Sequence, residues 1–249
     1  MPDAPVTAAI LVIGDEILSG RTKDRNIGYI AEYLARIGVE AREARVVPDV
    51  EDEIVAAVNA LRARYDYLFT TGGIGPTHDD ITADAIAKAF GVEIGEDPRA
   101  LAIMSERYAP GDFTPARRRM ARIPAGADLV DNPVSKAPGF RLGNVIVMAG
   151  VPSVMQAMLD HAIQGVKGGA VMLVETVEAG GVPEGKYGDA LAEIAKARPA
   201  VSIGSYPSFQ DGKFRNQIVV RARAAGVLAE AKAAVAAMVA RLRGDALPL

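Results

Sequence analysis

An apolar run, a glycine-rich turn and a helical pattern follow one another directly between residues 65 and 90. The run Tyr65–Phe69 has the length and composition of a buried strand, and apolar residues recur at helical spacing from Ile81 to Phe90. Between them lies Thr70–Thr82, with the sequence TTGGIGPTHDDIT. A strand that turns directly into a helix aims backbone N–H groups and the positive end of the helix dipole at one place. The segment therefore predicts an anion-binding turn on an α/β scaffold.

The same alternation of strand and helix continues through the first two thirds of the chain. Ala8–Ile13 is a continuous apolar run, and helical spacing follows over residues 27–37. Further strands are expected at residues 44–47 and 144–148. Continuous apolar strands that alternate with helices are typical of a parallel sheet covered on both faces. We therefore predict a three-layer α/β/α domain with a mostly parallel sheet over residues 1–166.

After the glycine-containing segment at 165–169 the pattern changes. Residues 167–249 contain a strand, a helix, two strands and a final helix. This order predicts a small α+β subdomain.

Composition excludes several classes of function. The net charge of −3 and the pI of about 5.5 give no basic field for nucleic acid. The absence of cysteine excludes disulfides and thiolate chemistry, and it fits a reducing cytoplasm. No apolar stretch approaches the roughly 20 residues that a membrane helix needs. We expect a cytoplasmic protein whose partner is a small molecule.

The carboxyl ends of the expected parallel strands carry small or acidic residues. Ligands in open α/β sheets bind at this edge, so these residues are candidates for one common cleft. The glycine turn lacks the lysine of a Walker motif, and His78 stands where the dinucleotide fingerprint has its third glycine. A nucleoside triphosphatase of the usual type is therefore disfavoured.

Three acidic residues are candidates for catalysis or metal binding, each with a structural alternative. Asp79 and Asp80 would bind a divalent cation together with phosphate oxygens, or would only stabilise a helix N-terminus by about 0.3–1 kcal/mol. Asp49 would act in the cleft or cap the helix that follows it.

His78 would ligate a softer metal such as Co²⁺ or Mn²⁺, or face solvent. Arg117–Arg119 is interpreted as a solvated basic face.

The ordered set of motifs resembles the molybdopterin-binding domain family of molybdenum-cofactor biosynthesis, and most closely the N-terminal region of the CinA proteins. The matching segments are Gly14–Gly20 with Asn26, the run Thr70–Thr82, Ala137–Phe140 and Gly150–Pro152. The C-terminal unit resembles the small subdomain that follows in CinA proteins. The family usually has a proline before Gly150 and an acid two residues after Pro152, where this chain has Ala149 and Val154.

The resemblance implies a pterin or nucleotide phosphate bound across the strand ends. It also implies catalytic roles for Asp49 and Asp80 and homo-oligomer formation. The metal-binding candidates stay Asp79 and Asp80, whose adjacent carboxylates a cation would hold together. The ligand-binding or phosphate-binding candidates are Gly14, Asp15, Glu16, Ser19, Asn26, Thr71, Gly72, Gly73, Gly75, Thr77, Lys136, Gly139, Gly150 and Pro152.

Three functions stay open. The first is binding of molybdopterin or a similar ligand, and the second is hydrolysis of ADP-ribose or FAD by a pyrophosphatase that uses Mg²⁺, Mn²⁺ or Co²⁺. The third is a non-catalytic interaction module. Adenylyl transfer to molybdopterin is a weaker alternative. Nicotinamide-nucleotide deamidation is not expected, because the chain lacks the amidohydrolase domain that many CinA proteins carry.

Overall fold

The computed structural model describes residues 5–109, 111–210 and 212–244. Contacts between Cα atoms divide the chain into the units Met1–Gly169 and Ala170–Leu249. Each unit has hydrophobic clusters of its own. The boundary falls at the end of the glycine-containing segment 165–169, three residues after the division expected from the sequence.

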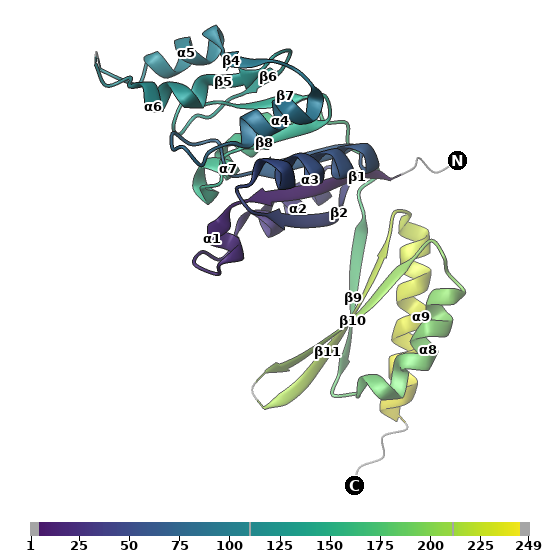
Figure 1. Ribbon diagram of the computed structural model, residues 1–249. Coiled ribbons are helices and arrows are strands. Elements are labelled where there is room, and N and C mark those ends of the chain that lie inside the picture. The colour runs from purple at the N-terminus through teal and green to yellow at the C-terminus, as the bar shows by residue number, and fades with distance from the viewer. Residues whose placement is uncertain (1–4, 110, 211, 245–249) are drawn as a thin grey trace. The chain divides into compact units, whose positions relative to one another are not determined.

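The first unit is built around a six-stranded sheet (Figure 1). Its strands are β1 (Val6–Ile13), β2 (Val39–Val47), β3 (Tyr67–Thr71), β6 (Asp128–Val130), β7 (Gly139–Leu142) and β8 (Val145–Met148). They lie in the order β2-β1-β3-β8-β7-β6, in which the first four are parallel and the last two antiparallel to their neighbours. The mostly parallel sheet predicted from the sequence is therefore confirmed.

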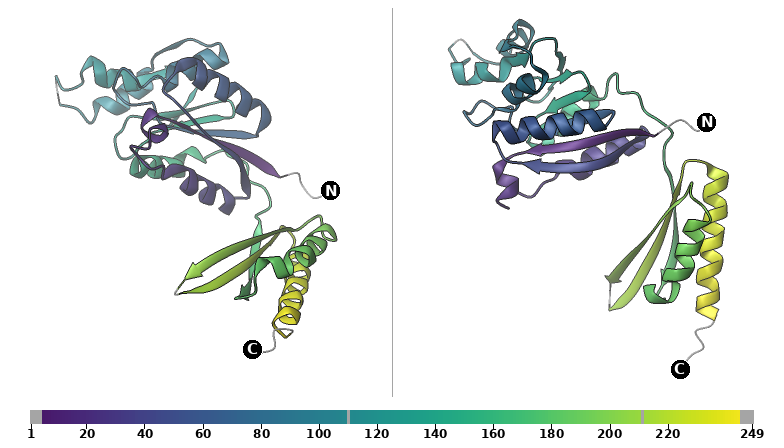
Figure 2. Two further views of the ribbon diagram at one scale, coloured as in Figure 1. Left: turned by 60° about the horizontal axis from the view of Figure 1, so that its bottom comes forward. Right: turned by 45° about the vertical axis from the view of Figure 1, so that its right-hand side comes forward.

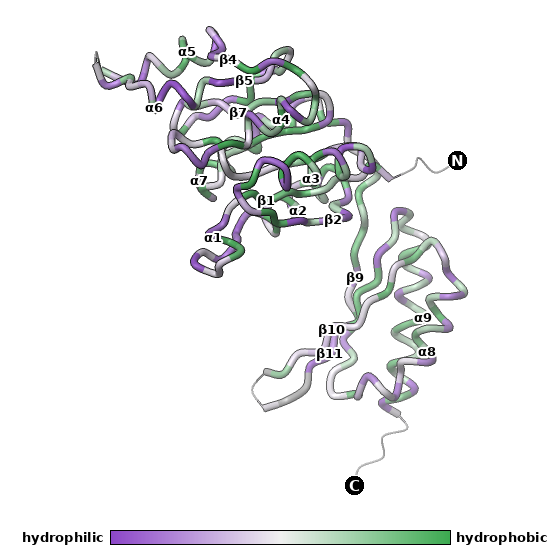
Figure 3. Tube along the Cα trace, viewed as in Figure 1, coloured by the Kyte–Doolittle hydropathy of each residue, from purple (hydrophilic) through white to green (hydrophobic). Residues whose placement is uncertain are grey.

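Helices cover both faces of this sheet (Figure 2). One cluster joins Ala9 and Leu11 of β1 to α3 (Glu51–Arg64) and α4 (Thr82–Phe90). The opposite cluster joins Ile10 of β1 to α2 (Asn26–Arg36) and α7 (Pro152–Ala162). Successive residues of a strand point to opposite faces, so the unbroken apolar run of β1 supplies both cores. The central strands accordingly form a hydrophobic interior between the helices (Figure 3).

Short elements complete the first unit. They are α1 (Asp15–Leu18), β4 (Ile94–Glu96), α5 (Pro98–Ser105), α6 (Pro115–Arg118), the 3₁₀ helix η1 (Arg119–Ala121) and β5 (Arg122–Pro124). The strands β4 and β5 form a separate antiparallel pair.

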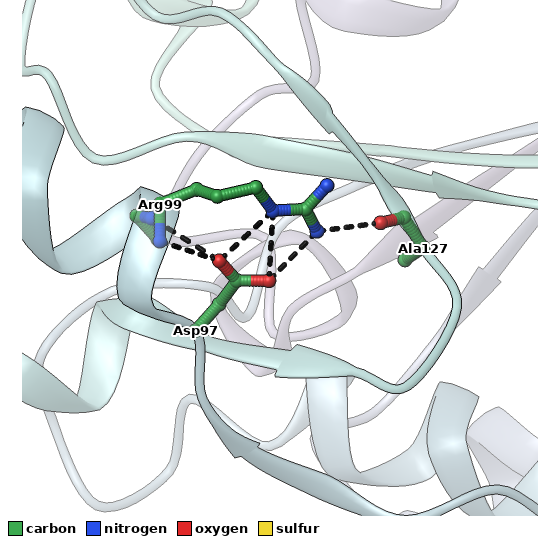
Figure 4. A network of polar contacts seen from close by, with 4 residues as sticks. Asp97, Arg99 and Ala127 are labelled. Carbon is green, nitrogen blue, oxygen red and sulfur yellow. Dashed lines mark hydrogen bonds and ion pairs between the residues drawn. The ribbon is translucent and has the colours of Figure 1, made fainter.

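Asp97 fixes the start of α5. Its carboxylate accepts hydrogen bonds from the backbone N–H groups of Arg99 (2.8 Å) and Ala100 (3.4 Å). The Arg99 guanidinium bonds the same carboxylate and also donates to the Ala127 carbonyl at 2.9 Å (Figure 4). The Asp97 amide donates to the Ala121 carbonyl at 2.8 Å, so this cap also holds η1 in place.

The second unit consists of β9 (Leu173–Gly180), α8 (Glu184–Lys196), β10 (Ser202–Gln210), β11 (Lys213–Ala222) and α9 (Ala225–Gly244). Its sheet is antiparallel in the order β10-β11-β9. Buried Tyr187 of α8 and Met238 of α9 belong to one cluster with Ile218 of β11. The β-α-β-β-α order expected from the sequence is confirmed. No helix in the described parts of the chain is long and apolar enough to cross a membrane.

Candidate functional site

A cleft of about 490 Å³ lies at the carboxyl ends of the four parallel strands. Gly14 follows β1, Asp49 follows β2, Gly72 follows β3 and Gly150 follows β8, and all four residues line the cleft. The sequence argument expected this convergence because parallel strands end at one edge of a sheet. The remaining lining residues are Ile13, Glu16, Thr22, Gly73, Ile74, Gly75, Asp79, Asp80, Met120, Asn132, Ser135, Ala137, Ala149, Val151, Pro152 and Val154.

Gly72 allows three strand ends to approach closely. Its φ is 108°, and a Cβ built on it would lie 2.0 Å from the Ile13 carbonyl oxygen. Its amide donates to the Met148 carbonyl at 3.2 Å, and a Cβ on Gly150 would lie 3.1 Å from the Gly72 Cα. Only glycine has both this backbone conformation and this lack of bulk.

Gly73 and Gly75 form the rest of the turn against the start of α4. A Cβ on Gly73, whose φ is 66°, would lie 2.2 Å from the Thr82 hydroxyl oxygen. That hydroxyl donates to the Gly72 carbonyl at 2.9 Å, and a Cβ on Gly75 would lie 2.6 Å from Asp80 Oδ2. The glycines therefore do more than form a turn. Because they have no side chains, the backbone of the turn and the Asp80 carboxylate stay at the surface of the cleft.

Thr77 holds the Asp80 carboxylate in a fixed position. Asp80 Oδ2 accepts a hydrogen bond from the Thr77 amide at 2.9 Å and one from its hydroxyl at 2.5 Å. Hydrogen bonding with Thr77 also lowers the pKa of Asp79, whose side chain is 63% exposed. His78, with a side chain that is 98% exposed, faces solvent beside them. The two hydrogen bonds from Thr77 make Asp80 the better oriented of the two carboxylates.

Asp49 bonds across the cleft rather than capping α3. The first residue before α3 is Val50, and no side chain caps that helix. Asp49 Oδ2 instead accepts a hydrogen bond from the Asp15 amide at 2.9 Å. Burial raises the pKa of Asp49, and the carboxylates of Asp15, Glu16 and Asp79 raise it further. A carboxyl group whose pKa is raised in a cleft is a candidate general base.

Two of the ligand-binding candidates lie beneath the cleft surface. Asn26 is 5% exposed and Thr71 is fully buried. The Asn26 amide donates to Thr71 Oγ1 at 2.9 Å and to the Gly150 carbonyl at 2.8 Å. The Thr71 hydroxyl donates to the Ala149 carbonyl at 2.8 Å. These side chains join the start of α2 to the ends of β3 and β8 and thereby shape the cleft.

Several other candidates are not among the residues that line the cleft. Gly139 is buried in β7, where a Cβ would lie 2.2 Å from the Val147 carbonyl oxygen, so the structure shows a packing reason for it. Lys136 has a left-handed φ of 66° and is held by a turn in which its amide donates to the Asn132 carbonyl. The candidates outside the lining set are Asp15, Ser19, Asn26, Thr71, Thr77, Lys136 and Gly139.

Several other residues that line the cleft were not predicted from the sequence. Met120 comes from η1, and Asn132 and Ser135 come from the turn before β7. Asn132 is 2% exposed, and its amide donates to Ser135 Oγ and to the Ala137 carbonyl. The segment Asn132–Ala137, with its asparagine, proline and serine, was a recognisable turn signal. The sequence pointed to Lys136 and to Ala137–Phe140 in this region, but it gave no sign that Asn132 and Ser135 would line the cleft.

The carboxylates of the cleft supply only part of the ligands that a metal ion needs. Across the described residues, no group of three or more His, Cys, Asp or Glu side chains is placed to hold a metal ion. Mg²⁺ is often held by one or two carboxylates together with substrate phosphates. Asp79 and Asp80 therefore fit a cation that binds along with a phosphate, and do not form a complete cage for one.

Comparison with known protein families identifies the family to which this chain belongs. A family model described as "Probable molybdopterin binding domain" matches residues 9–167. This chain belongs to that family. A second model, described as "FAD synthase, middle domain", matches residues 176–243.

The relatives agree with the resemblance to CinA proteins. A Pyrobaculum arsenaticum protein is 37% identical over 210 residues, which are 80% of this chain and 79% of that protein. A CinA-like protein of Desulfosudis oleivorans is 36% identical over 79% of this chain but only 51% of its own length. The crystal structure of the Thermoplasma acidophilum protein CinA, described as of unknown function, matches with a TM-score of 0.61 and 36% identity. That match covers 65% of this chain and 98% of the CinA chain.

Proposed function

We propose that the first unit binds a small molecule carrying a phosphate group, either a pterin or a nucleotide, in the cleft at the strand ends. The observation that carries this proposal is the convergence of four strand ends on one cleft around the Gly72–Gly75 turn. Because this turn is built of glycines, a ligand can approach its backbone closely. This suits a phosphate bound by backbone amides near the start of α4. The description of the family names molybdopterin as a ligand of such domains.

A second candidate is hydrolysis of a pyrophosphate bond in a dinucleotide such as ADP-ribose or FAD. Two observations favour it: Asp49 and Asp80 line the same cleft, and the second unit matches the middle domain of FAD synthase. Asp49, with its raised pKa, would accept a proton from the attacking water. The water oxygen would bond to one phosphorus while the bridging P–O bond breaks, leaving two phosphate monoesters.

In this reaction Asp79 and Asp80 would hold a divalent cation, which would neutralise phosphate charge. The amides of Gly73 and Gly75 would stabilise the oxyanion that develops. Val154, which stands where the family usually has an acid, lines the cleft and gives that wall an apolar side chain.

One panel separates these functions. ADP-ribose, FAD, NAD and ATP are incubated with the protein and Mg²⁺, Mn²⁺, Co²⁺ or EDTA, and released AMP or phosphate is measured. Metal-dependent hydrolysis that Asp80→Asn abolishes supports the enzyme, and Asp131→Asn, at an exposed aspartate outside the cleft, is the matched control. Silence across the panel, combined with thermal stabilisation by molybdopterin, supports binding alone. If no compound stabilises the protein, the non-catalytic interaction module gains. The homo-oligomer predicted from the family stays a prediction, which light scattering on the full chain tests.

A further inference from the structure

The main cleft carries strong negative charge. Its lining includes the carboxylates of Glu16, Asp49, Asp79 and Asp80, and among the described residues that line it there is no lysine or arginine. A phosphate group placed there meets like charges at short range. Backbone amides, and a divalent cation bound together with the ligand, would offset part of this repulsion. A basic side chain at the edge of the cleft would complete the recognition of an anion.

A smaller cavity adjoins the cleft and contains such side chains. It shares Gly73, Gly75, Asp80 and Met120 with the cleft, and its own part of the wall includes Arg119 and Arg122. Its volume of about 20 Å³ admits a group the size of one water molecule. The shared residues place this cavity directly behind the glycine turn.

Arg122 is already committed to a partner. Its guanidinium nitrogens lie 2.7 and 3.0 Å from the two carboxylate oxygens of Asp84. This bidentate pair satisfies Arg122 and fixes the cavity wall.

Arg119 is different from its neighbours. Its Nε is buried, and it has no hydrogen-bond partner among the residues that the structure describes. Arg117 bonds the Asp112 carbonyl and lies 4.6 Å over the Tyr108 ring, and Arg118 pairs with Glu96. Arg117 and Arg118 are thus occupied away from both cavities, whereas Arg119 lines one of them. The interpretation of all three arginines as one solvated face is therefore wrong for Arg119.

A buried donor without a partner is costly, and such groups in native proteins usually meet a ligand, ion or water. We propose that Arg119 binds a phosphoryl oxygen of the ligand, opposite the Gly73–Gly75 amides. The planar guanidinium suits a phosphate or diphosphate, because it can donate parallel hydrogen bonds to two oxygens of such a group. The small cavity itself has room for one of these oxygens, which would reach Nε. This inference rests on the proposed function, because it assigns a phosphate of the same ligand. The ligand class is accordingly a phosphate ester or diphosphate.

The test uses inorganic pyrophosphate with Mg²⁺ as the probe, titrated calorimetrically into the full chain. Arg119→Met is expected to weaken pyrophosphate binding at least tenfold, because a charge-assisted fork is lost. Arg119→Lys, which keeps the charge and loses the fork, is expected to fall between Arg119→Met and the wild type. Arg118→Met removes a neighbouring arginine that lines neither cavity, and its affinity is expected to stay within twofold of the wild type.

Stability separates this role from a structural one. Since Arg119 Nε has no protein partner, Arg119→Met is expected to leave the melting temperature without ligand unchanged or slightly higher. If Arg119→Met does not fold, the measurement uses the Nε–H NMR signal of Arg119 in the wild type instead. This signal is assigned because it is absent from the spectrum of Arg119→Lys. That signal is expected to shift on addition of pyrophosphate to the wild type.

Two results overturn the proposal: wild-type protein that does not bind pyrophosphate, or Arg119→Met that binds it as the wild type does. An unshifted Arg119 Nε–H signal at saturating pyrophosphate has the same consequence. These results are distinct from a failure of the proposed function. Pyrophosphate that binds through Arg119, together with no response to pterins or dinucleotides, would keep this anion site and reject those ligands.

Discussion

Alanine at Gly73 and at Gly91 separates the two reasons why a protein needs glycine. The backbone φ is 66° at Gly73 and 65° at Gly91, so an alanine experiences the same left-handed strain at both positions. The space differs, because a Cβ on Gly73 would lie 2.2 Å from the Thr82 hydroxyl oxygen and nothing lies within 4 Å of one on Gly91. The comparison isolates the close approach that builds the cleft.

The expected magnitudes follow from these environments. Left-handed alanine costs about 1–2 kcal/mol, and the reduced entropy of the unfolded chain offsets about 0.4–1 kcal/mol of it. Gly91→Ala is thus expected to lower the free energy of unfolding by about 1 kcal/mol. Gly73→Ala additionally crowds Thr82, which is fully buried and bonded to the Gly72 carbonyl, and such crowding costs about 1–3 kcal/mol more.

Urea denaturation of the two variants measures the difference. For an m-value of about 2 kcal/mol/M, the midpoint of Gly73→Ala should lie about 0.5–1.5 M below that of Gly91→Ala. Equal midpoints would mean that the turn has no steric need for glycine at residue 73.

Three further substitutions test individual contacts. Asp97→Ala removes the α5 cap and should cost about 1–2 kcal/mol in urea denaturation; an unchanged midpoint would contradict the role given to the cap. Asp49→Asn should stabilise the protein at pH 7, because the raised pKa means that ionised Asp49 opposes folding; the gain should vanish below pH about 3.9, where Asp49 is protonated in both states. Thermal melts between pH 3 and 7 check this, and a gain that is independent of pH would count against it. Asp66→Asn should destabilise at pH 7 by about 1 kcal/mol, because the Asp66 carboxylate accepts bonds from the Thr7 amide and hydroxyl, both at 2.7 Å, that lower its pKa. That loss should shrink as pH falls below about 3.9, and a constant loss down to pH 3 would contradict the assignment.

The sequence predicted the central strands and the covering helices because their hydrophobic patterns are strong. The unbroken apolar run at Ala8–Ile13 predicts a buried strand, and the helical spacing after Asn26 predicts a helix. The strands β4 to β7 have three or four residues each and were not predicted. These short stretches mix polar and apolar residues without a readable period, unlike the continuous apolar run of β8, and their pairing depends on contacts distant in sequence.

The candidate site shows the same division. Strand-end residues such as Gly14, Asp49 and Gly150 could be placed in one cleft from the sequence, because the topology of a parallel sheet determines where they meet. Met120 in the cleft and Arg119 in the adjoining cavity could not, since η1 is placed there by tertiary packing against α5 and β5. Burial, which separates Asn26 and Thr71 from the surface residues, is likewise a property of the folded unit.

Everything proposed for this protein depends on whether the cleft at the strand ends binds a phosphate-bearing ligand. The most direct test records the backbone amide NMR signals of the labelled full chain while ADP-ribose, FAD or molybdopterin is added with Mg²⁺. We expect at least one of these ligands to shift the amide signals of Gly72, Gly73, Gly75 and Gly150, which line the cleft. Shifts confined to other surfaces, or no shifts with any of the three ligands, would contradict it.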